Sequence, residues 1–235
     1  MKFCVVGYGA MGKIISEMLG DDLACNVALE CKYKSLFDTD GNFDCIIDFS
    51  NPANLDMILD YAKKYNKPVV FATTGYTDEQ LEKINALANT NAVLRSANFS
   101  LGVILLNRLV KEITPVLKDF DVEIVEAHHN KKIDSPSGTA KMLLNSIVTE
   151  QSKVTYGREG YSPREKNEVG VHSIRGGTVV GVHEVSYFGN DEIITLKHEA
   201  NSKKIFATGA IMAAKWLVNK PNGFYNMEDV LFGNK

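Results

Sequence analysis

A short polar stretch of the chain carries most of its candidate chemistry. It runs from Glu126 to Ala140 with the sequence E-A-H-H-N-K-K-I-D-S-P-S-G-T-A, and it holds two of the five histidines and two adjacent lysines. Imidazole and ammonium groups attract anions, because charged donors make short, strong hydrogen bonds to carboxylates. We therefore expect a pocket for a small acid, one with more than one carboxylate. Taken alone, the same residues also fit a surface histidine pair and two solvated lysines.

The end of this stretch has the features of a helix start. Ser135 or Ser137 is a suitable N-cap, and Pro136 suits a first-turn position. Gly138 lets the backbone come close to a bound group. The free N–H groups of a helix N-terminus favour an anion, so this helix start is expected to add to the pocket.

Regular elements must hold the stretch on both sides. The alternating residues 122–125 predict a strand, and residues 140–144 predict a helix. The histidines and lysines are therefore expected in the loop between them. His172, His183 and His198 lie within other strand patterns, and we interpret each of them as structural.

The N-terminal segment has a second motif with a clear physical role. Residues 2–6 predict a short buried strand, and a helical pattern follows at residues 13–19. Between them stands G-x-G-x-x-G, made of Gly7, Tyr8, Gly9, Ala10, Met11 and Gly12. In this context Gly7 permits a tight turn, Gly9 lets the backbone approach a pyrophosphate, and Gly12 allows close helix packing. We expect this loop to bind a dinucleotide.

The next strand, at residues 27–29, ends at Glu30. An acid there accepts hydrogen bonds from the ribose hydroxyls and repels a 2′-phosphate, which favours NAD over NADP. Lys32 and Lys34 could instead neutralise a 2′-phosphate, and an exposed acid at a strand end remains the structural alternative.

Strand and helix patterns alternate up to residue 96, which predicts a parallel sheet with right-handed crossovers. Ligands of such sheets bind beyond the carboxyl ends of the strands. Residues 48–50, 73–75 and 96–99 fall at these ends. Their small hydroxyl and amide side chains suit contacts to a ribose and a carboxamide.

We predict an α/β protein: an N-terminal Rossmann dinucleotide-binding domain plus an α+β substrate-binding and oligomerisation domain with an open mixed sheet. The first would comprise residues 1–100 and 209–235, and the second residues 101–208. A helix is expected at residues 103–117 and another at 205–219. Residues 153–167 are expected to form a loop or flap, and the turn at 176–178 to join two strands.

Composition excludes several classes of protein. The chain has 235 residues, 45% of them hydrophobic and 23% charged, and a net charge of −3, so neither nucleic acid nor a membrane is an expected partner. No apolar run reaches the roughly 18 residues of a spanning helix, and we expect no signal peptide. Four cysteines without C-x-x-C spacing argue against a metal site and fit the cytoplasm.

Several motifs together resemble one family. The string from Glu126 to Ala140 is the most specific of them, and V-G-Y-G-A-M-G at residues 6–12, I-D-F-S at 47–50, A-T-T-G at 72–75 and A-N-F-S at 97–100 accompany it in order. They resemble 4-hydroxy-tetrahydrodipicolinate reductase, also called dihydrodipicolinate reductase, over essentially the whole chain. The resemblance implies reduction of a cyclic imine dicarboxylate with NADH or NADPH and loss of water, in lysine and diaminopimelate biosynthesis. It also implies a homotetramer.

The resemblance also implies roles for particular residues. His128 would be the catalytic acid/base histidine and Lys132 the general acid, while His129, Gly138 and Thr139 would bind substrate carboxylates. The cofactor would be held by the glycine loop from Gly7 to Gly12, by Glu30, and by two turns made of Ala72, Thr73 and Thr74 and of Ser96, Ala97, Asn98 and Phe99. Because the glycine loop and the cationic pocket belong to different domains, hydride transfer would require the domains to close.

Two departures from the family pattern concern the cofactor. Cys31 stands where well-known members have an arginine that grips a 2′-phosphate, so NADH should serve at least as well as NADPH. The segment between Glu30 and Asp48 is short, which predicts a shortened helix and strand there.

Other functions share some of these sequence features. An amino-acid dehydrogenase of similar plan, such as aspartate dehydrogenase, is the main alternative. A semialdehyde dehydrogenase would need a nucleophilic cysteine near its substrate, and no cysteine follows Cys45. A nucleotide-sensing module would have no use for His128 and Lys132.

Overall fold

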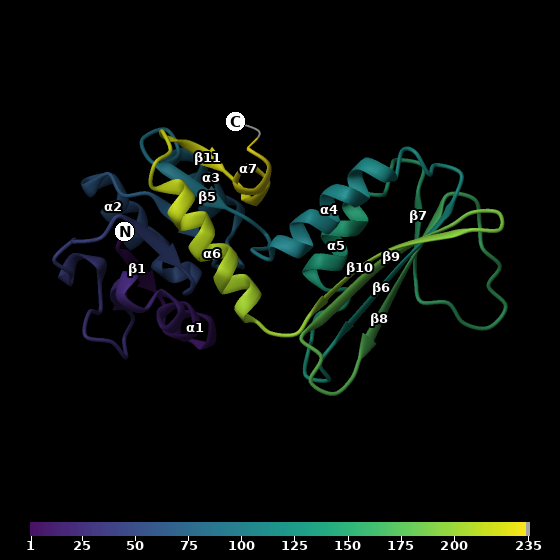
Figure 1. The fold of residues 1–235 in the computed structure, drawn as a ribbon, viewed down its shortest axis with the longest axis horizontal. Helices are drawn as coiled ribbons and strands as arrows, with labels where there is room; N and C mark the ends of the chain where they lie inside the picture. Colours follow the sequence, from purple (N-terminus) through teal and green to yellow (C-terminus); the bar gives the residue numbers. More distant parts are fainter. Residues whose placement is uncertain (234–235) are drawn as a thin grey trace. The chain divides into compact units, whose positions relative to one another are not determined.

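The computed structural model describes residues 1–233, and the chain divides into two compact units (Figure 1). The first unit contains residues 1–101 and the C-terminal segment that starts at Lys204, and the second contains Gly102–Lys203. Each unit is built on its own sheet. The predicted α/β class, with a Rossmann-like parallel sheet and a second mixed sheet, is confirmed.

The first unit has a six-stranded parallel sheet in the order β11-β5-β4-β3-β1-β2. Its strands are β1 (Phe3–Val6), β2 (Leu23–Val27), β3 (Cys45–Asp48), β4 (Val69–Phe71), β5 (Ala92–Arg95) and β11 (Gly223–Tyr225). Strands β1, β3 and β4 are buried along their whole length, as expected for a sheet covered on both faces. The strand order reverses at β1 and β3, which is where open α/β sheets bind ligands.

Helices and short 3-10 turns connect or flank these strands. They are α1 (Ala10–Leu19), α2 (Leu55–Tyr65), α3 (Asp78–Leu87), α6 (Lys204–Leu217) and α7 (Met227–Phe232), with 3-10 turns η1 (Gly20–Asp22), η2 (Leu36–Asp38) and η3 (Pro52–Asn54). Side chains cap several of them. Asn51 accepts from the N–H of Ala53, and Thr77 forms a capping box with Gln80.

The second unit has a five-stranded mixed sheet in the order β10-β9-β6-β8-β7. Its elements are α4 (Leu101–Ile113), β6 (Asp121–His128), α5 (Gly138–Asn145), β7 (Lys153–Tyr156), β8 (Glu168–Arg175), β9 (Gly181–Phe188) and β10 (Ile193–Ala200). Both helices lie on one face of the sheet (Figure 1) and pack on it through a core that includes Val110, Ile124, Leu143 and Tyr187. The opposite face is not covered by a helix of this unit.

Several elements differ from the prediction. Strand β2 ends at Val27, so Glu30 lies in a turn, and the exposed Leu29 belongs to no strand. Strand β7 occupies part of the predicted flap at residues 153–167. Strands β8 and β9 are joined by the turn at 176–178 but do not pair, since β6 lies between them. The short segment after Glu30 keeps only η2.

Strand β6 differs in the way that matters most for function. It extends to His128 rather than ending at residue 125. His128 and Glu126 therefore lie on a strand and not in the predicted loop, which begins only at His129.

Candidate active site

Strand β6 positions Glu126 and His128, the central pair of the site. Alternate side chains of a strand share a face, so Glu126 and His128 both point to the helix-covered side of the sheet. Glu126 is fully buried and His128 is 9% exposed. The Nδ1 atom of His128 lies 2.6 Å from Oε2 of Glu126, which is a short, charge-assisted contact.

Two further groups satisfy the buried carboxylate of Glu126. Arg175, on the neighbouring strand β8, donates to Oε1 at 2.7 Å and to Oε2 at 2.9 Å. The backbone N–H of Ser137 donates to Oε1 at 3.1 Å. The loop before α5 is thus tied to the strand by the same carboxylate that contacts His128.

The pKa values of this pair follow from those contacts. Burial raises the pKa of Glu126, but hydrogen bonds from Arg175, Ser173 and His128 outweigh it and leave the pKa at about 2. Burial lowers the pKa of His128, and the charges of Lys132 and Arg175 add to this effect, while Glu126 opposes it. Near neutral pH the carboxylate is therefore ionised and the imidazole largely neutral.

His183, on β9, is a neighbour of the Glu126–His128 pair. The sequence alone does not show this proximity. Its ring lies edge-on to that of His128, with centroids 5.1 Å apart, and its Nε2 lies 3.0 Å from Oγ of Ser137. Burial, followed by the charge of His128, lowers its pKa to about 4. Ser137 is also the N-cap of α5, since its Oγ accepts from the N–H of Ala140. His183 thus supports the helix start beside the site.

Lys132 and His129 lie in the turn that follows β6. The Nζ atom of Lys132 is 2.7 Å from Oδ1 of Asp134, and this lysine side chain is 19% exposed. The backbone carbonyl of Asp134 accepts from Arg175 at 2.8 Å, which links the lysine pair to the Glu126 cluster. Nδ1 of His129 is buried and has no hydrogen-bond partner among the described residues.

The first turn of α5 completes this group of candidates. Gly138 and Thr139 are its first two residues, where backbone N–H groups have no acceptor within the helix. Gly138 is exposed, and a Cβ placed on it would have no atom within 4 Å. The space above this backbone is open, as a bound carboxylate requires.

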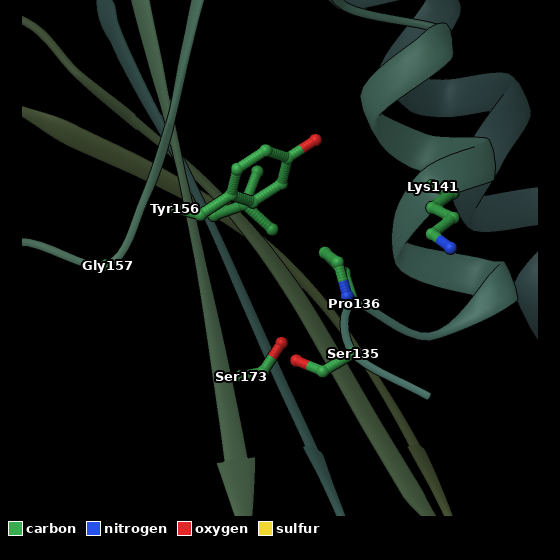
Figure 2. A pocket seen from close by; sticks show the side chains of 7 residues that line it. Ser135, Pro136, Lys141, Tyr156, Gly157 and Ser173 are labelled. Atoms are coloured by element: carbon green, nitrogen blue, oxygen red, sulfur yellow. The ribbon is translucent and has the colours of Figure 1, made fainter. Parts of the chain in front are cut away.

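A cavity of about 500 Å³ adjoins the Glu126 cluster. Figure 2 shows the hydroxyls of Ser135 and Ser173 facing each other across it, with Lys141 on helix α5 and Tyr156 on the other side. Ser173 also hydrogen-bonds to Glu126. None of the predicted substrate residues lines this cavity.

The first unit holds the predicted cofactor loop, between β1 and α1. Gly7 has a φ of +102°, which a side chain would strain, and a Cβ on it would lie 2.3 Å from the carbonyl oxygen of Phe49. A Cβ on Gly12 would lie 2.3 Å from the carbonyl oxygen of Gly7, whereas one on Gly9, the residue before α1, would have nothing within 4 Å. The loop is thus packed at two glycines and open at the third.

A cavity of about 410 Å³ lies along this loop. Its lining includes Gly7, Tyr8, Gly9, Glu30, Lys34, Phe49, Ser50 and Asn51. Open backbone at a helix N-terminus beside a cavity fits the pyrophosphate of a dinucleotide. Ala10, Met11 and Gly12, which open α1, are not part of this lining.

The residues around Glu30 are arranged by a lysine. Nζ of Lys34 donates to the carbonyl oxygens of Leu29 and Cys31, and so holds the turn that presents Glu30 to the cavity. The ammonium of Lys32 lies 4.8 Å from the ring centroid of Tyr33. Both lysines that could neutralise a 2′-phosphate therefore have other contacts.

The two other predicted cofactor turns follow β4 and β5. Ala72 is half-buried and Thr74 exposed, but Thr73 is buried, and its Oγ1 accepts from the N–H of Ser50 at 2.8 Å. In the second turn Asn98 and Phe99 are buried, Ala97 is exposed, and Oγ of Ser96 donates to the carbonyl of Asn98 at 2.6 Å.

A buried acid anchors the first of these turns. Asp48, at the end of β3, accepts from Oγ of Ser50 at 2.5 Å and from the hydroxyl of Tyr76 at 2.7 Å. Burial raises its pKa, which these hydrogen bonds partly offset. Asp48 and Thr73 thus join the loops at the carboxyl ends of β3 and β4.

His128, Lys132, His129, Gly138 and Thr139 all belong to the second unit, while Gly7, Tyr8, Gly9 and Glu30 line one cavity of the first. The predicted cofactor turns at 72–74 and 96–99 do not line that cavity. Within residues 1–233, no three side chains of His, Cys, Asp or Glu are grouped as a metal site would require. No helix in that range is long and apolar enough to cross a membrane.

Comparison with known proteins gives consistent matches. Residues 1–99 match the family model described as dihydrodipicolinate reductase, N-terminus, and residues 102–231 match the one described as dihydrodipicolinate reductase, C-terminus. A 4-hydroxy-tetrahydrodipicolinate reductase of Clostridium novyi (strain NT) is 43% identical over 238 residues, covering 95% of this chain and 94% of the relative. One from Brachyspira hyodysenteriae is 43% identical and covers 98% and 100%.

Solved structures agree with this at the level of the fold. A dipicolinate-bound dihydrodipicolinate reductase from Paenisporosarcina sp. TG-14 has a TM-score of 0.75 at 21% identity and covers 99% of both chains. An aspartate dehydrogenase from Thermotoga maritima gives 0.52 at 15% identity, covering 94% of this chain and 98% of its own.

Proposed function

The chain belongs to the dihydrodipicolinate reductase family, and from this premise we propose which of its residues carry the reaction and which cofactor it prefers. The enzyme reduces 4-hydroxy-tetrahydrodipicolinate to tetrahydrodipicolinate with NAD(P)H and with loss of water, in lysine and diaminopimelate biosynthesis. What supports the proposed roles most is the cluster of His128, His129, Lys132 and the first turn of α5 in the second unit.

The proposed mechanism assigns separate tasks to these residues. Bound NAD(P)H supplies the hydride. Lys132 donates a proton to the ring as it gains electrons, and a positioned acid of this kind contributes roughly 10²–10⁴-fold. Asp134 orients the ammonium of Lys132 from 2.7 Å away. His128 is the acid/base group beside the ring.

Three groups would hold the substrate carboxylates. His129 has a buried Nδ1 with no partner among the described residues, and a carboxylate would supply one. The helix start at Gly138 and Thr139, with open space beside Gly138, suits a second carboxylate. Such contacts fix the ring in one orientation, which lowers the entropic part of the barrier.

The activity is tested directly by measuring the oxidation of NADH and of NADPH in the presence of the cyclic substrate. This substrate is the product of the synthase that precedes the reductase in the pathway, and it is generated freshly for the assay. We expect turnover that depends on both the dicarboxylate and the reduced nucleotide. Aspartate with NAD⁺ is the control for the dehydrogenase alternative and should give no reaction. Turnover of aspartate without turnover of the cyclic substrate would contradict the proposal.

We further propose that NADH serves at least as well as NADPH. Glu30 lines the cofactor cavity and would repel a 2′-phosphate, while Lys34 and Lys32 contact backbone carbonyls and Tyr33 instead. Replacing Glu30 with Ala should raise kcat/KM for NADPH relative to NADH. An unchanged ratio would show that Glu30 does not set the preference.

Assembly and location complete the proposal. The uncovered face of the second unit's sheet carries exposed Ile174 and Ile193, and we propose that it joins subunits of a homotetramer. The four cysteines are free thiols, and Cys25 Sγ donates a hydrogen bond to Cys4 Sγ at 3.3 Å instead of forming a disulfide, which suits the reducing cytoplasm.

A further inference from the structure

We propose that Glu126 is a positioning residue that fixes the imidazole of His128 in the tautomer with its proton on Nδ1 and its lone pair on Nε2. This role deepens the proposed function, because it depends on His128 acting in the reaction. It adds a carboxylate and, through it, Arg175 to the residues on which catalysis depends.

The hydrogen bonds that the buried carboxylate of Glu126 can make determine which group donates in its contact with His128. An ionised carboxylate can only accept hydrogen bonds, and with a pKa of about 2 Glu126 is ionised at any pH near neutrality. The 2.6 Å contact between Oε2 and Nδ1 therefore requires the proton on Nδ1. In a neutral imidazole, Nε2 then carries the lone pair.

The backbone register makes this arrangement rigid. His128 lies opposite Arg175 and Glu126 lies opposite Ser173 in the parallel pairing of β6 with β8. Arg175 grips both carboxylate oxygens, so the Glu126 side chain cannot rotate without losing two charge-assisted hydrogen bonds. Two paired strands thus hold the acid, and the acid holds the imidazole.

A glycine stands beside Nε2, on the far side of the ring from Glu126. A Cβ at Gly181 would lie 3.1 Å from Nε2 of His128, so the glycine leaves room beside this nitrogen. His183, whose ring lies edge-on to that of His128, has its own Nε2 3.0 Å from Oγ of Ser137. Neither neighbour competes with Glu126 for the Nδ1 proton.

The substitution Glu126→Gln hardly changes the side-chain volume, but it reverses which group donates in the hydrogen bond to His128. Arg175 would hold the amide oxygen, because its N–H groups only donate, and the amide nitrogen would then face His128. Since that nitrogen also donates, Nδ1 would become the acceptor and the proton would move to Nε2. The imidazole would then present a protonated Nε2, without its lone pair, to the substrate.

The ¹⁵N shifts of the histidine rings at neutral pH, without substrate, test this directly. The His128 signals are assigned by their loss in His128→Ala. We expect the Nδ1–H tautomer in the wild-type enzyme and the Nε2–H tautomer in Glu126→Gln. Because the first measurement needs no Glu126 variant, a wild-type spectrum showing Nε2–H would overturn the proposal even if the variant failed to fold.

The same variant is then assayed for turnover and NADH affinity. We expect kcat to fall by roughly 10²–10⁴-fold with unchanged affinity for NADH, which binds in the other unit. The matched control is Glu123→Gln, since Glu123 lies on the same strand and contacts His172 Nε2 at 2.7 Å on the other face of the sheet. Its kcat should stay near that of the wild type.

The outcomes separate the two proposals. A folded Glu126→Gln enzyme with the changed tautomer and full turnover would overturn the positioning role while leaving the reaction intact. A wild-type enzyme that does not reduce the substrate would overturn the proposed function, whatever the histidine spectra show.

Discussion

His128 and Lys132 come from one short stretch of chain but are held in different ways. His128 is buried on a strand and is fixed by a fully buried acid, whereas Lys132 is in a turn and pairs with the exposed Asp134. A surface ion pair of this type is weak, typically about 0–1 kcal/mol. In the proposed mechanism Lys132 can therefore exchange Asp134 for a substrate group at little cost, while the imidazole keeps its orientation.

Removing either side chain should affect the chemistry and not the cofactor. We expect His128→Ala and Lys132→Ala each to lower kcat by roughly 10²–10⁴-fold, because each loses a positioned acid or base. NADH affinity, measured by fluorescence titration, should be unchanged. Lys131→Ala is the comparison for Lys132, since its exposed side chain differs in position but not in charge. Turnover within a few-fold of the wild type in both test variants would contradict the assignment.

Within the first unit, two glycines of one loop should respond differently to alanine. In Gly12→Ala the new Cβ would meet the Gly7 carbonyl oxygen at 2.3 Å, so α1 must shift and the free energy of unfolding should fall. In Gly9→Ala the Cβ enters open space beside the cavity, so stability should be kept while NADH affinity falls. Thermal unfolding and NADH titration of both variants distinguish these effects. Equal NADH affinity of Gly9→Ala and the wild type would show that the phosphates do not approach this backbone.

Elements could be predicted where the local pattern of apolar residues and glycines matches the burial of those residues in the fold. The strand, glycine loop and helix from Phe3 to Leu19 are confirmed because buried apolar residues and glycines mark them locally. Strand β6 was predicted too short, because Glu126 and His128 are polar residues on its buried face. Alternation alone could have revealed that they share a face, since they are two residues apart.

Other parts of the site depend on contacts that no local pattern contains. Glu126 is satisfied by Arg175, which is 49 residues away in sequence, and His183 reaches Ser137 across 46 residues. Only the order of strands in the sheet brings these groups together. For the same reason the sequence could not show that β6 separates β8 from β9.

The whole molecule should lose stability as the pH falls below neutral. His183 has a pKa of about 4 in the folded protein and about 6.5 when unfolded, so the unfolded chain binds more protons between these values. Its contribution is complete above about pH 6.5 and is lost as the pH falls toward 4. Each pKa unit corresponds to about 1.4 kcal/mol, so the loss is on the order of 2–4 kcal/mol.

Denaturant unfolding at a series of pH values measures this loss. His183→Gln, which places an amide near Ser137, should flatten the dependence between pH 6.5 and 4. Below about pH 4.5 a further loss is expected in both proteins, since the folded state holds the pKa of Glu126 at about 2. An equally steep dependence in His183→Gln would assign the effect to other groups.

The prediction for subunit assembly concerns the exposed apolar face of the second unit's sheet. By strand alternation Ile174, Phe188 and Ile193 share the sheet face opposite the helix-packed core, and all three are exposed. Lysine at position 193 would place a charge in an apolar interface, which is costly to bury without a partner. Ile193→Lys should therefore convert the proposed homotetramer to smaller species in light scattering. Glu150→Lys, at an exposed site outside this sheet, should leave the tetramer intact. A wild-type enzyme that is monomeric at assay concentrations would exclude this face as a subunit interface.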